Sequence, residues 1–247
     1  MIHVKPILRA LFPNLYKQLY IAHKHYTQSK QILAEAQSLK ALTLTQGFEA
    51  YLSAILNSET FHTAQKREEI AQLLQRVQRL QPRILCEIGC YRGGTLSLFS
   101  CVVARKSRFI SIDLNHNPRY FRAYHHFWSN QGRLDLINGN SYASRTVERV
   151  KHLLRGNAID FLFIDGDHSY EGVSADFQAY APLVRTGGLI GFHDILPDYR
   201  TRYGKVTSAD SGEVYKFWEE IKRRFQFEEY IQDQHQDGFG IGVIVKE

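Results

Sequence analysis

A chain of 247 residues, 44% hydrophobic and 23% charged, has an ordinary globular composition with ample material for a core. No stretch reaches the roughly 18 to 20 uninterrupted apolar residues that cross a bilayer, which argues against a membrane-spanning protein. The net charge of +6 comes from the N-terminal third, where residues 1–82 hold ten Lys and Arg against five Asp and Glu. Without a Lys/Arg block or interleaved aromatics, this excess indicates a solvated helical face, and we expect no nucleic-acid partner.

Three cysteines, Cys86, Cys90 and Cys101, lie in one short region of the chain. Their spacing matches no metal-finger pattern, and the strand and helix expected around Cys86 and Cys101 do not favour a disulfide. We predict free thiols in a reducing compartment. The start, "MIHVKPILRALFPN", has only a fragmentary apolar segment and no small-residue cleavage site. We therefore expect a soluble, cytoplasmic protein with no membrane partner.

Residues 14–80 carry a helical pattern that breaks around Gly47. An early apolar stripe consists of Leu15, Leu19, Ala22 and Tyr26, and a later one of Ile70, Leu73, Leu74, Val77 and Leu80. The later stripe predicts an amphipathic helix that Thr63 caps and Pro82 ends. We expect residues 1–80 to form a helical extension that either covers the functional site or joins two copies into a homo-oligomer. Residues 81–247 form the main domain.

After Pro82, short apolar runs alternate with stretches long enough for helices. The runs are "RILCEIG", "RFISIDL", "RLDLING", "IDFLFIDG" and "GGLIGFHD". Near-continuous apolar runs indicate strands covered on both faces, and hence a parallel sheet with right-handed crossovers. The segments "FQFEEYI" and "GFGIGVIVKE" around a turn-rich stretch indicate an antiparallel hairpin. The predicted fold is α/β: a doubly wound, Rossmann-like, mostly parallel seven-stranded sheet with a C-terminal hairpin and an N-terminal helical extension.

The loop "CEIGCYRGGTLSL" follows the first strand, where an open α/β sheet places its ligand. Gly89 and Gly93 let the backbone turn tightly and bring the loop, Tyr91 included, close to a bound molecule. Their spacing fits neither the G-x-G-x-x-G of dinucleotide-binding proteins nor the Gly-Lys-Ser/Thr of a P-loop. Glu87, two residues before Gly89, would repel a pyrophosphate but attract an ammonium group.

Two later strand ends add polar groups. Asp113 closes the second strand about 20 residues after the glycines, where an acid accepts hydrogen bonds from ribose hydroxyls. A helix cap is its alternative role. Asn140 and Ser141 follow the third strand and are placed to line an adenine. An ammonium, a ribose and an adenine without phosphates together describe S-adenosylmethionine.

The segments "EIGCYRGGT", "SIDL", "FIDGDHSYEGVSADFQAYAPLVRTGGLIGFHD" and the hairpin carry a family resemblance as an ordered set. Through them, residues 83–247 resemble the class I S-adenosylmethionine-dependent methyltransferases. The strongest similarity is to a group related to macrocin-type O-methyltransferases and the cephalosporin hydroxylase family. The resemblance implies S-adenosylmethionine as the cofactor and methyl transfer as the reaction. The N-terminal 80 residues lie outside it.

Polar residues end the fourth and fifth strands. Asp165 follows one, and His193 and Asp194 follow the other; neighbouring parallel strands lie about 4.8 Å apart, so the three side chains can converge. Two carboxylates suit a divalent cation such as Mg²⁺ or Mn²⁺, and the resemblance assigns Asp165 and Asp194 as its ligands. His193 departs from the oxygen ligand usual in metal-using relatives, and imidazole favours softer ions than Mg²⁺. The alternative is that Asp165 holds the cofactor's ammonium without any metal.

Asp167 and His168 come directly after this predicted metal ligand. A hydroxyl acceptor must lose its proton before it attacks the methyl group, so a general base is needed. The "DGD" of sugar-acting relatives favours Asp167, followed by His168 and then His193. Asp167 and Ser169 have a structural alternative, as caps of the helix that begins near Tyr170.

A long segment, "ILPDYRTRYGKVTSADSGEVYKFWEEI", follows the fifth strand and is typical of a lid or substrate wall. Its candidate acceptor contacts are Tyr199, Arg200, Arg202, Tyr203 and Lys205. The sequence therefore predicts a methyltransferase that methylates an oxygen of a small acceptor, a sugar or natural product, with a divalent cation. The alternatives are a silent or differently reacting cofactor-binding protein on the same fold, and a nucleic-acid methyltransferase.

Overall fold

The computed structural model describes residues 13–247. Residues 1–12, where we expect no secretory signal, lie outside the described residues. Within residues 13–247, no helix is both long enough and apolar enough to cross a membrane. All three cysteines are free, as predicted: Cys86 and Cys90 are buried and Cys101 is half-buried.

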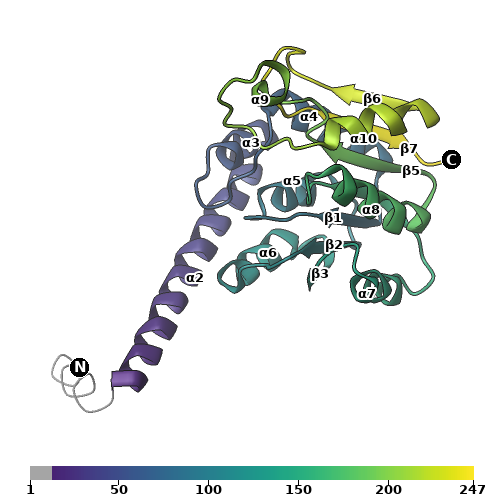
Figure 1. The fold of residues 1–247 in the computed structure, drawn as a ribbon. Coiled ribbons are helices and arrows are strands. Elements are labelled where there is room, and N and C mark those ends of the chain that lie inside the picture. The colour runs from purple at the N-terminus through teal and green to yellow at the C-terminus, as the bar shows by residue number, and fades with distance from the viewer. Residues whose placement is uncertain (1–12) are drawn as a thin grey trace.

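Seven strands of the described chain form one sheet in the order β3-β2-β1-β4-β5-β7-β6 (Figure 1). They are β1 Ile84–Ile88, β2 Ser107–Asp113, β3 Gly132–Asn138, β4 Ile159–Ile164, β5 Val184–His193, β6 Phe227–Tyr230 and β7 Ile241–Val245. Strands β1 to β5 pair in parallel, whereas β7 runs antiparallel to both β5 and β6. The predicted mostly parallel sheet with a C-terminal hairpin is confirmed.

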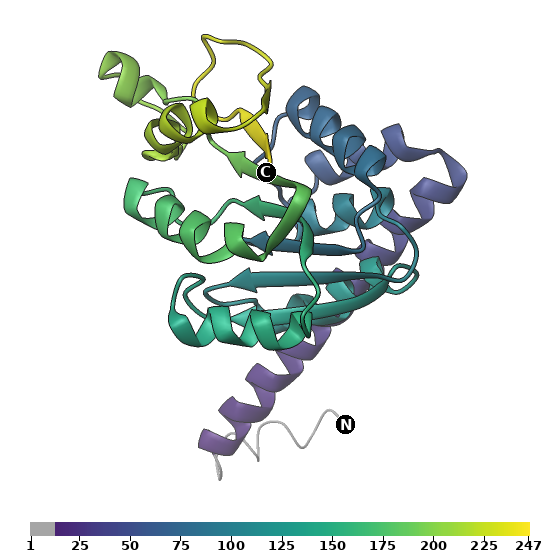
Figure 2. The ribbon, with the colours of Figure 1, turned by 90° about the vertical axis from the view of Figure 1, so that its right-hand side faces the viewer.

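Helices cover both faces of the sheet (Figure 2). On one face lie α2 Pro13–Thr45, α3 Phe48–Leu56, α4 Arg67–Leu80, α5 Gly94–Val102 and α6 Phe121–Trp128. On the other lie α7 Ser144–Leu154, α8 Tyr170–Tyr180 and α10 Val214–Ile221. The short helix α9 Tyr199–Tyr203 lies in the segment after β5. Because successive strand residues point to opposite faces, Leu85 packs into the first layer and Cys86 into the second. This double burial explains the near-continuous apolar runs.

The strand register places the functional edge. Ile88 at the end of β1 pairs with Ile112 and with Ile164, and Ile164 pairs with Phe192. The next residue along each strand belongs to one row across four neighbouring strands: Gly89, Asp113, Asp165 and His193. From β1 the chain adds β2 and β3 on one side of the sheet, and β4 and β5 on the other. Open α/β sheets bind ligands at such a switch point, here between β1 and β4.

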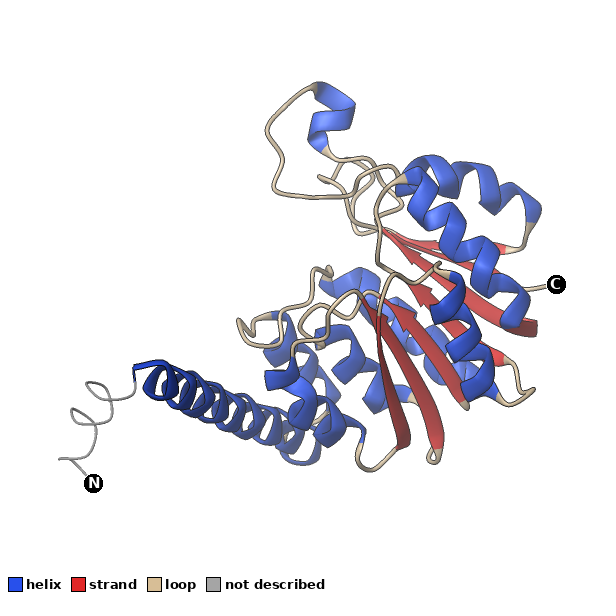
Figure 3. Ribbon diagram, turned by 60° about the horizontal axis from the view of Figure 1, so that its bottom comes forward, coloured by secondary structure: helices blue, strands red, loops and turns tan. Residues whose placement is uncertain are grey.

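The first half of α2 projects away from the rest of the molecule, whereas its second half packs against α3 and α6 (Figures 1 and 3). Lys40 fixes this packing, because its ammonium donates to the carbonyls of His126 (2.8 Å) and Phe127 (2.9 Å) at the end of α6. Gly47, with φ of 84°, separates α2 from α3, as the helical break predicted.

The helices before the sheet are tied to both the sheet and the C-terminal hairpin. Glu69 of α4 is fully buried, and its carboxylate accepts hydrogen bonds from the backbone N–H of Gln232 (3.1 Å) and Gly240 (2.9 Å) and from Nε2 of Gln236 (2.7 Å). Removing this acceptor would leave the buried N–H of Gly240 unsatisfied, because only Gln236 has a second acceptor, the Gly238 carbonyl, at 2.9 Å. The division of the chain at residue 80 stays a prediction.

Helix α4 starts later than expected. It begins at Arg67 after Lys66, so the prediction that Thr63 caps it is wrong. The Thr63 hydroxyl instead forms a hydrogen bond of 2.9 Å with the Thr95 hydroxyl at the start of α5. Residues 61–66 therefore pack beside the glycine loop and the start of α5, and α4 begins after them at Arg67.

Candidate active site

A cavity of about 780 Å³ opens at the carboxyl edge of the sheet. Its walls come from the loops after β1, β2, β3 and β4, from residues 62–64 and from Asp210. Of the residues predicted to form the site, the cavity is lined by Gly89, Tyr91, Asp113, Asn140, Ser141, Asp165, Asp167 and His168. A second, polar cavity of about 940 Å³ lies beside α2 and shares Tyr91 and Asn115 with the first.

The glycine loop has the tight conformation that the sequence predicts. Gly89 has φ of 89°, and a Cβ atom there would lie 1.8 Å from the carbonyl oxygen of Asp165. Gly93 has φ of 79°, and a Cβ there would lie 2.3 Å from the ring of Tyr124. Any side chain at these two positions would force β1 away from β4 or displace α6. Gly93 ends the loop as the residue before α5 and does not line the cavity.

Asp113 holds the glycine loop in place. Its Oδ2 accepts hydrogen bonds from the backbone N–H of Cys90 (2.9 Å) and Tyr91 (3.0 Å), and its Oδ1 accepts one from Asn115 (2.9 Å). A carboxylate has about four acceptor sites, two on each oxygen, so Oδ1 keeps capacity for one further donor. Asp113 lines the cavity, so its predicted contact with ribose hydroxyls stays a prediction that this geometry permits.

Glu87 lies away from the cavity. It shares the face of β1 that carries Leu85, is fully buried, and neither carboxyl oxygen makes a full hydrogen bond. Burial, and then the charges of Asp165 and Asp113, raise the pKa of Glu87 well above its ordinary value, so the neutral carboxyl is favoured. The predicted contact of Glu87 with the cofactor's ammonium stays a prediction. Groups that line the cavity are better placed than Glu87 to contact a bound ligand.

The loop after β3, which we predicted to line an adenine, forms part of the cavity wall. Asn140 Oδ1 accepts a hydrogen bond from the N–H of Tyr142 (3.0 Å), and the Ser141 carbonyl accepts one from the hydroxyl of Tyr180 (2.7 Å). These bonds fix the backbone while leaving the amide of Asn140 beside the cavity. Adenine binding by Asn140 and Ser141 stays a prediction.

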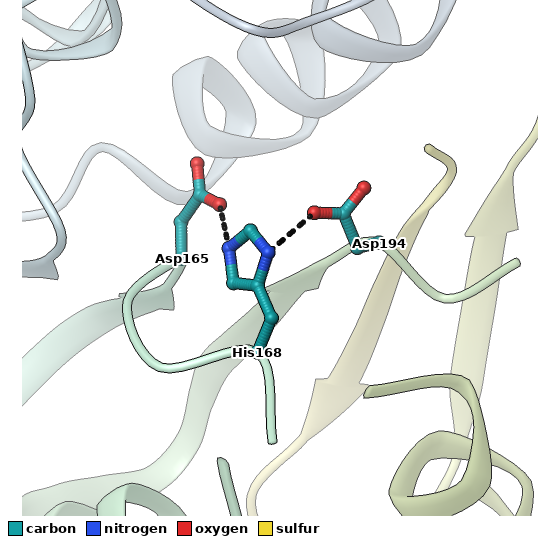
Figure 4. Close-up of side chains that lie close together, drawn as sticks. All are labelled: Asp165, His168 and Asp194. Carbon is teal, nitrogen blue, oxygen red and sulfur yellow. Dashed lines mark ion pairs between the residues drawn. The ribbon is translucent and has the colours of Figure 1, made fainter. Parts of the chain in front are cut away.

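Asp165, His168 and Asp194 form the Asp–His–Asp cluster, with one ligand atom of each within 4.8 Å of the others (Figure 4). His168 Nε2 lies 3.7 Å from Asp165 Oδ1, and its Nδ1 lies 3.4 Å from Asp194 Oδ2. Asp194 adopts the left-handed region, with φ of 62°, and its Oδ1 accepts a hydrogen bond of 3.2 Å from Ser211. The convergence of Asp165 with Asp194 is as predicted, and the cluster's histidine is His168.

His193, the predicted third metal ligand, packs against the two carboxylates of this cluster. Its side chain is almost fully buried, and its Nδ1 lies 3.1 Å from Asp165 Oδ1 and 3.2 Å from Asp194 Oδ2. Its Nε2 is buried without a hydrogen-bond partner. His193 therefore contacts both carboxylates without lining the cavity, and its roles as ligand or base stay predictions.

The two histidines and two aspartates neutralise one another. Burial lowers the pKa of His168, but the adjacent Asp165 and Asp194 carboxylates outweigh it and raise the value to about 9. Burial opposes and the same carboxylates likewise raise the pKa of His193 well above its usual range. Burial would raise the pKa of Asp165, yet the imidazoles hold it far below its ordinary value. A divalent cation at these carboxylates must displace imidazolium protons.

Asp167 lines the cavity but is committed to local hydrogen bonds. Its Oδ1 accepts from the N–H (3.0 Å) and hydroxyl (2.8 Å) of Ser169, and its Oδ2 accepts from the hydroxyl of Tyr142 (3.2 Å). The bonds from Ser169 hold the pKa of Asp167 below its ordinary value, which weakens it as a base. Ser169 caps α8 by accepting from the N–H of Gly172 (3.0 Å), as the structural alternative predicted.

The segment after β5 contacts the cavity through residues other than the predicted ones. The cavity lining includes Asp210 but none of the five candidate acceptor contacts between residues 199 and 205. The backbone carbonyl of Asp210 accepts a hydrogen bond from His168 Nδ1, and the N–H of Glu213 donates to the carbonyl of His168 (2.7 Å). No side-chain pattern in the sequence indicates Asp210, because it contacts His168 through its backbone carbonyl.

Residues 61–66 are the other part of the site that sequence reasoning missed. His62, Thr63 and Ala64 line the cavity, and Gln65 Nε2 donates a hydrogen bond of 3.1 Å to Asp165 Oδ2. The sequence pattern that could have indicated them is a run of small and polar residues just before an amphipathic helix. The same pattern is typical of any helix N-terminus, so it does not distinguish a binding site.

Comparison with known proteins agrees with this geometry. Residues 86–195 match a family model described as a methyltransferase domain. An O-methyltransferase of Bacillus cereus in complex with SAH has a TM-score of 0.56 at 18% identity, over 86% of this chain and 91% of that one. TomG of Streptomyces achromogenes, an O-methyltransferase involved in tomaymycin synthesis and solved in complex with SAM, has a TM-score of 0.55 at 15% identity, over 80% and 89%.

A sequence relative is the uncharacterized protein R132 of Acanthamoeba polyphaga mimivirus, 54% identical over 44 residues. That match spans 18% of this chain and 20% of the length of the relative. The chain has the Rossmann-like fold of these O-methyltransferases. Residues 86–195, from β1 to just past β5, match the methyltransferase domain.

Asp176 gives the region behind the cavity a pH-dependent stability. This α8 carboxyl is fully buried near Gly166, and burial raises its pKa from 3.8 to about 7, although the Ser141 hydroxyl opposes the rise. Between these pH values the folded state binds a proton that the unfolded state has released. The stabilising contribution is therefore complete below pH 3.8 and is lost as the pH rises through about 7.

Asp176→Asn should remove this dependence. At pH 8 we expect the variant to be more stable than the parent by up to about 4 kcal/mol, since one pKa unit corresponds to about 1.4 kcal/mol. Near pH 4 the two should coincide, because an amide resembles a protonated carboxyl. Urea unfolding at both pH values measures the difference, with Glu148→Gln, an exposed carboxylate on α7, as the control. Equal stabilities at pH 8 would contradict the prediction.

Proposed function

We propose that this methyltransferase transfers the methyl group of S-adenosylmethionine to a hydroxyl oxygen of a small acceptor, such as a sugar or a natural product. The single observation that carries the proposal is the Asp–His–Asp cluster at one end of the cavity, because oxygen methylation requires a site that removes or weakens the acceptor proton. The O-methyltransferases that share the fold support the same reaction.

His168 is the general base in this proposal. Its Nδ1 is held by the Asp210 carbonyl and Asp194, while its Nε2 faces Asp165 along the cavity wall. Because Asp165 and Asp194 raise the pKa of His168 to about 9, its neutral imidazole predominates only above that pH. In that neutral form it takes the acceptor's proton at Nε2, the acceptor oxygen bonds to the methyl carbon, and the carbon–sulfur bond breaks to leave S-adenosylhomocysteine. Asp167 ranks below His168, because Ser169 and Tyr142 already occupy its oxygens.

Asp165 and Asp194, with His168, are the residues that would hold a divalent cation, and with His168 so engaged the cation would take the place of the general base. Two carboxylates and one imidazole within 4.8 Å fit Mn²⁺ well and Mg²⁺ less well, because Mg²⁺ prefers oxygen ligands. A bound cation would supply Lewis acidity that lowers the pKa of the acceptor hydroxyl. The complete set of charged groups favours catalysis over a silent cofactor-binding protein.

Binding of S-adenosylhomocysteine tests the ribose contact at Asp113. The parent should bind this product more tightly than its 2′-deoxyribose analogue, by about 10-fold or more, since a hydrogen bond to a charged group contributes about 1.5 to 3 kcal/mol. Asp113→Asn should reduce that preference, even if it also loosens the glycine loop. Calorimetry with both ligands measures the ratio, and Asp135→Asn on β3, outside the cavity, is the control. A preference that survives in Asp113→Asn would overturn the ribose assignment.

Manganese binding tests the cation site directly. EDTA-treated protein should bind Mn²⁺, seen as loss of the free-ion electron paramagnetic resonance signal, and Asp194→Asn should weaken binding at least about 10-fold, because half of the carboxylate charge is lost. Asp167→Asn should retain binding, since its oxygens serve Ser169 and Tyr142. A parent protein that leaves millimolar Mn²⁺ free would remove the cation from the proposal.

We further propose that two copies associate through the projecting half of α2. Leu15, Leu19 and Tyr26 are 46%, 52% and 55% exposed and follow alternating spacings of three and four residues with Ala22, the pattern of a helix-pairing seam. Lys17 and Lys24 lie two residues from seam positions and so point away from it, which avoids like-charge contact. Analytical ultracentrifugation should show a dimer that Leu19→Glu dissociates. Leu44→Glu, on the exposed far end of α2, should leave the dimer intact; a monomeric parent would refute the contact.

A further inference from the structure

The second cavity, of about 940 Å³, takes no part in the proposed reaction. It lies between α2 and the loops after β1 and β2, and most of its lining residues are polar. Arg92 from the first of these loops and Arg119 from the short 3₁₀ helix Pro118–Tyr120 after β2 both line it. Two permanent cations from separate segments therefore border a hollow that is large enough for a small molecule.

Both arginines have neutral hydrogen-bond partners. Arg92 Nη1 donates to the carbonyl of Glu59 at 2.6 Å, and Arg119 Nη2 donates to Nε2 of His25 at 2.7 Å. These contacts position the guanidinium groups without neutralising them. Within residues 13–247 neither group forms an ion pair with a carboxylate, and residues 1–12 contain no Asp or Glu. Because a guanidinium has five N–H donors, both arginines keep donors for a ligand.

Two acids also line this cavity, and they differ in their contacts. The Glu35 carboxylate accepts hydrogen bonds from the hydroxyls of Ser58 (2.9 Å) and Thr60 (2.5 Å), which tie it to the segment after α3. The Glu59 side chain is exposed and forms no ion pair with either arginine in the described part of the chain. Its negative charge therefore opposes an anion in the cavity, and its removal should favour one.

The two guanidinium groups act on the same part of the cavity wall. Burial raises the pKa of Tyr120, and the charges of Arg92 and Arg119 oppose that rise. Both cations are therefore within electrostatic reach of one phenol hydroxyl, which donates to the carbonyl of Thr60 at 3.1 Å. Guanidinium groups match the oxygens of a phosphate in geometry, and a phosphate ester carries about −1.5 to −2 charges at pH 7, which two arginines balance.

We propose that the second cavity binds a small hydroxylated phosphate ester, whose phosphate contacts Arg92 and Arg119. The cavity is larger than a bare phosphate needs, and Gln31 and Asn117 in its lining supply amide groups for hydroxyls. The inference goes beyond the methyl-transfer reaction and does not rest on it, because neither arginine lines the first cavity.

Calorimetry with glucose 6-phosphate as the probe tests this site. The parent should bind the probe, and Arg119→Gln should weaken binding about 10-fold or more, the size of a charge-assisted hydrogen bond. Arg92→Gln should act in the same direction, whereas Glu59→Gln should tighten binding because it removes an opposing charge. Arg149→Gln changes an exposed arginine on α7 outside both cavities and should bind the probe as the parent does.

Glucose and inorganic phosphate identify the recognised group. Inorganic phosphate that binds less tightly than glucose 6-phosphate would assign the site to the ester, and equal binding would assign it to the free anion; both results keep a phosphate site at the arginines. Glucose that binds as tightly as its phosphate would overturn the inference. So would a parent that leaves both phosphate ligands unbound at millimolar concentrations, or an Arg119→Gln variant that binds the probe as the parent does.

S-adenosylhomocysteine reports on the first cavity separately. Arg119→Gln should bind it as the parent does, which shows that the variant is folded. Should Arg119→Gln fail to fold, the opposite shifts expected for Arg92→Gln and Glu59→Gln decide the matter, and equal affinities in these two variants would overturn the inference. A parent that does not bind S-adenosylhomocysteine would count against the proposed function and leave the phosphate site standing.

Discussion

The structure depends on the alignment of four parallel strand ends. Beyond the last paired residues, the N–H of Gly89 donates to the carbonyl of Ile112 and the N–H of Asp165 donates to the carbonyl of Ile88, both at 2.8 Å. These two bonds carry the ladder one residue past the strands and bring a glycine, two acids and a histidine to one edge. The lack of a side chain at Gly89 is essential, because Asp165 occupies the space where its Cβ would lie.

That alignment concentrates charge where burial makes it costly. Asp165 and Asp194 approach each other closely, which two bare carboxylates would not tolerate in a buried setting. His193, which is buried, and His168, which lines the cavity, supply the compensating charge, and each interacts with both acids. The same groups carry the proposed chemistry, in which a divalent cation would take the place of the imidazolium protons.

The N-terminal helices are part of this arrangement. Through Glu69 they contact the hairpin that closes the sheet, and through Gln65 they contact the carboxylate at its centre. Thr63 links them to the first helix of the matched domain. The domain matched by sequence similarity therefore omits residues that complete the cavity. Of the described N-terminal helices, the first half of α2 is the part that projects from the body.

The sequence by itself determined the sheet and most of the row at its edge. Buried parallel strands produce continuous apolar runs, and polar residues directly after them must lie at one edge, which located Asp113, Asp165 and Asp194. Even the orientation of Glu87 follows from the two-residue period that it shares with Leu85. Tertiary structure decided which histidine faces the cavity, since His168 is positioned by Asp210 and Asp194 from the segment after β5. It also decided the place of Gln65, which lies 100 residues from Asp165 in the chain. Contacts across such separations depend on how whole layers pack, and no local pattern records them.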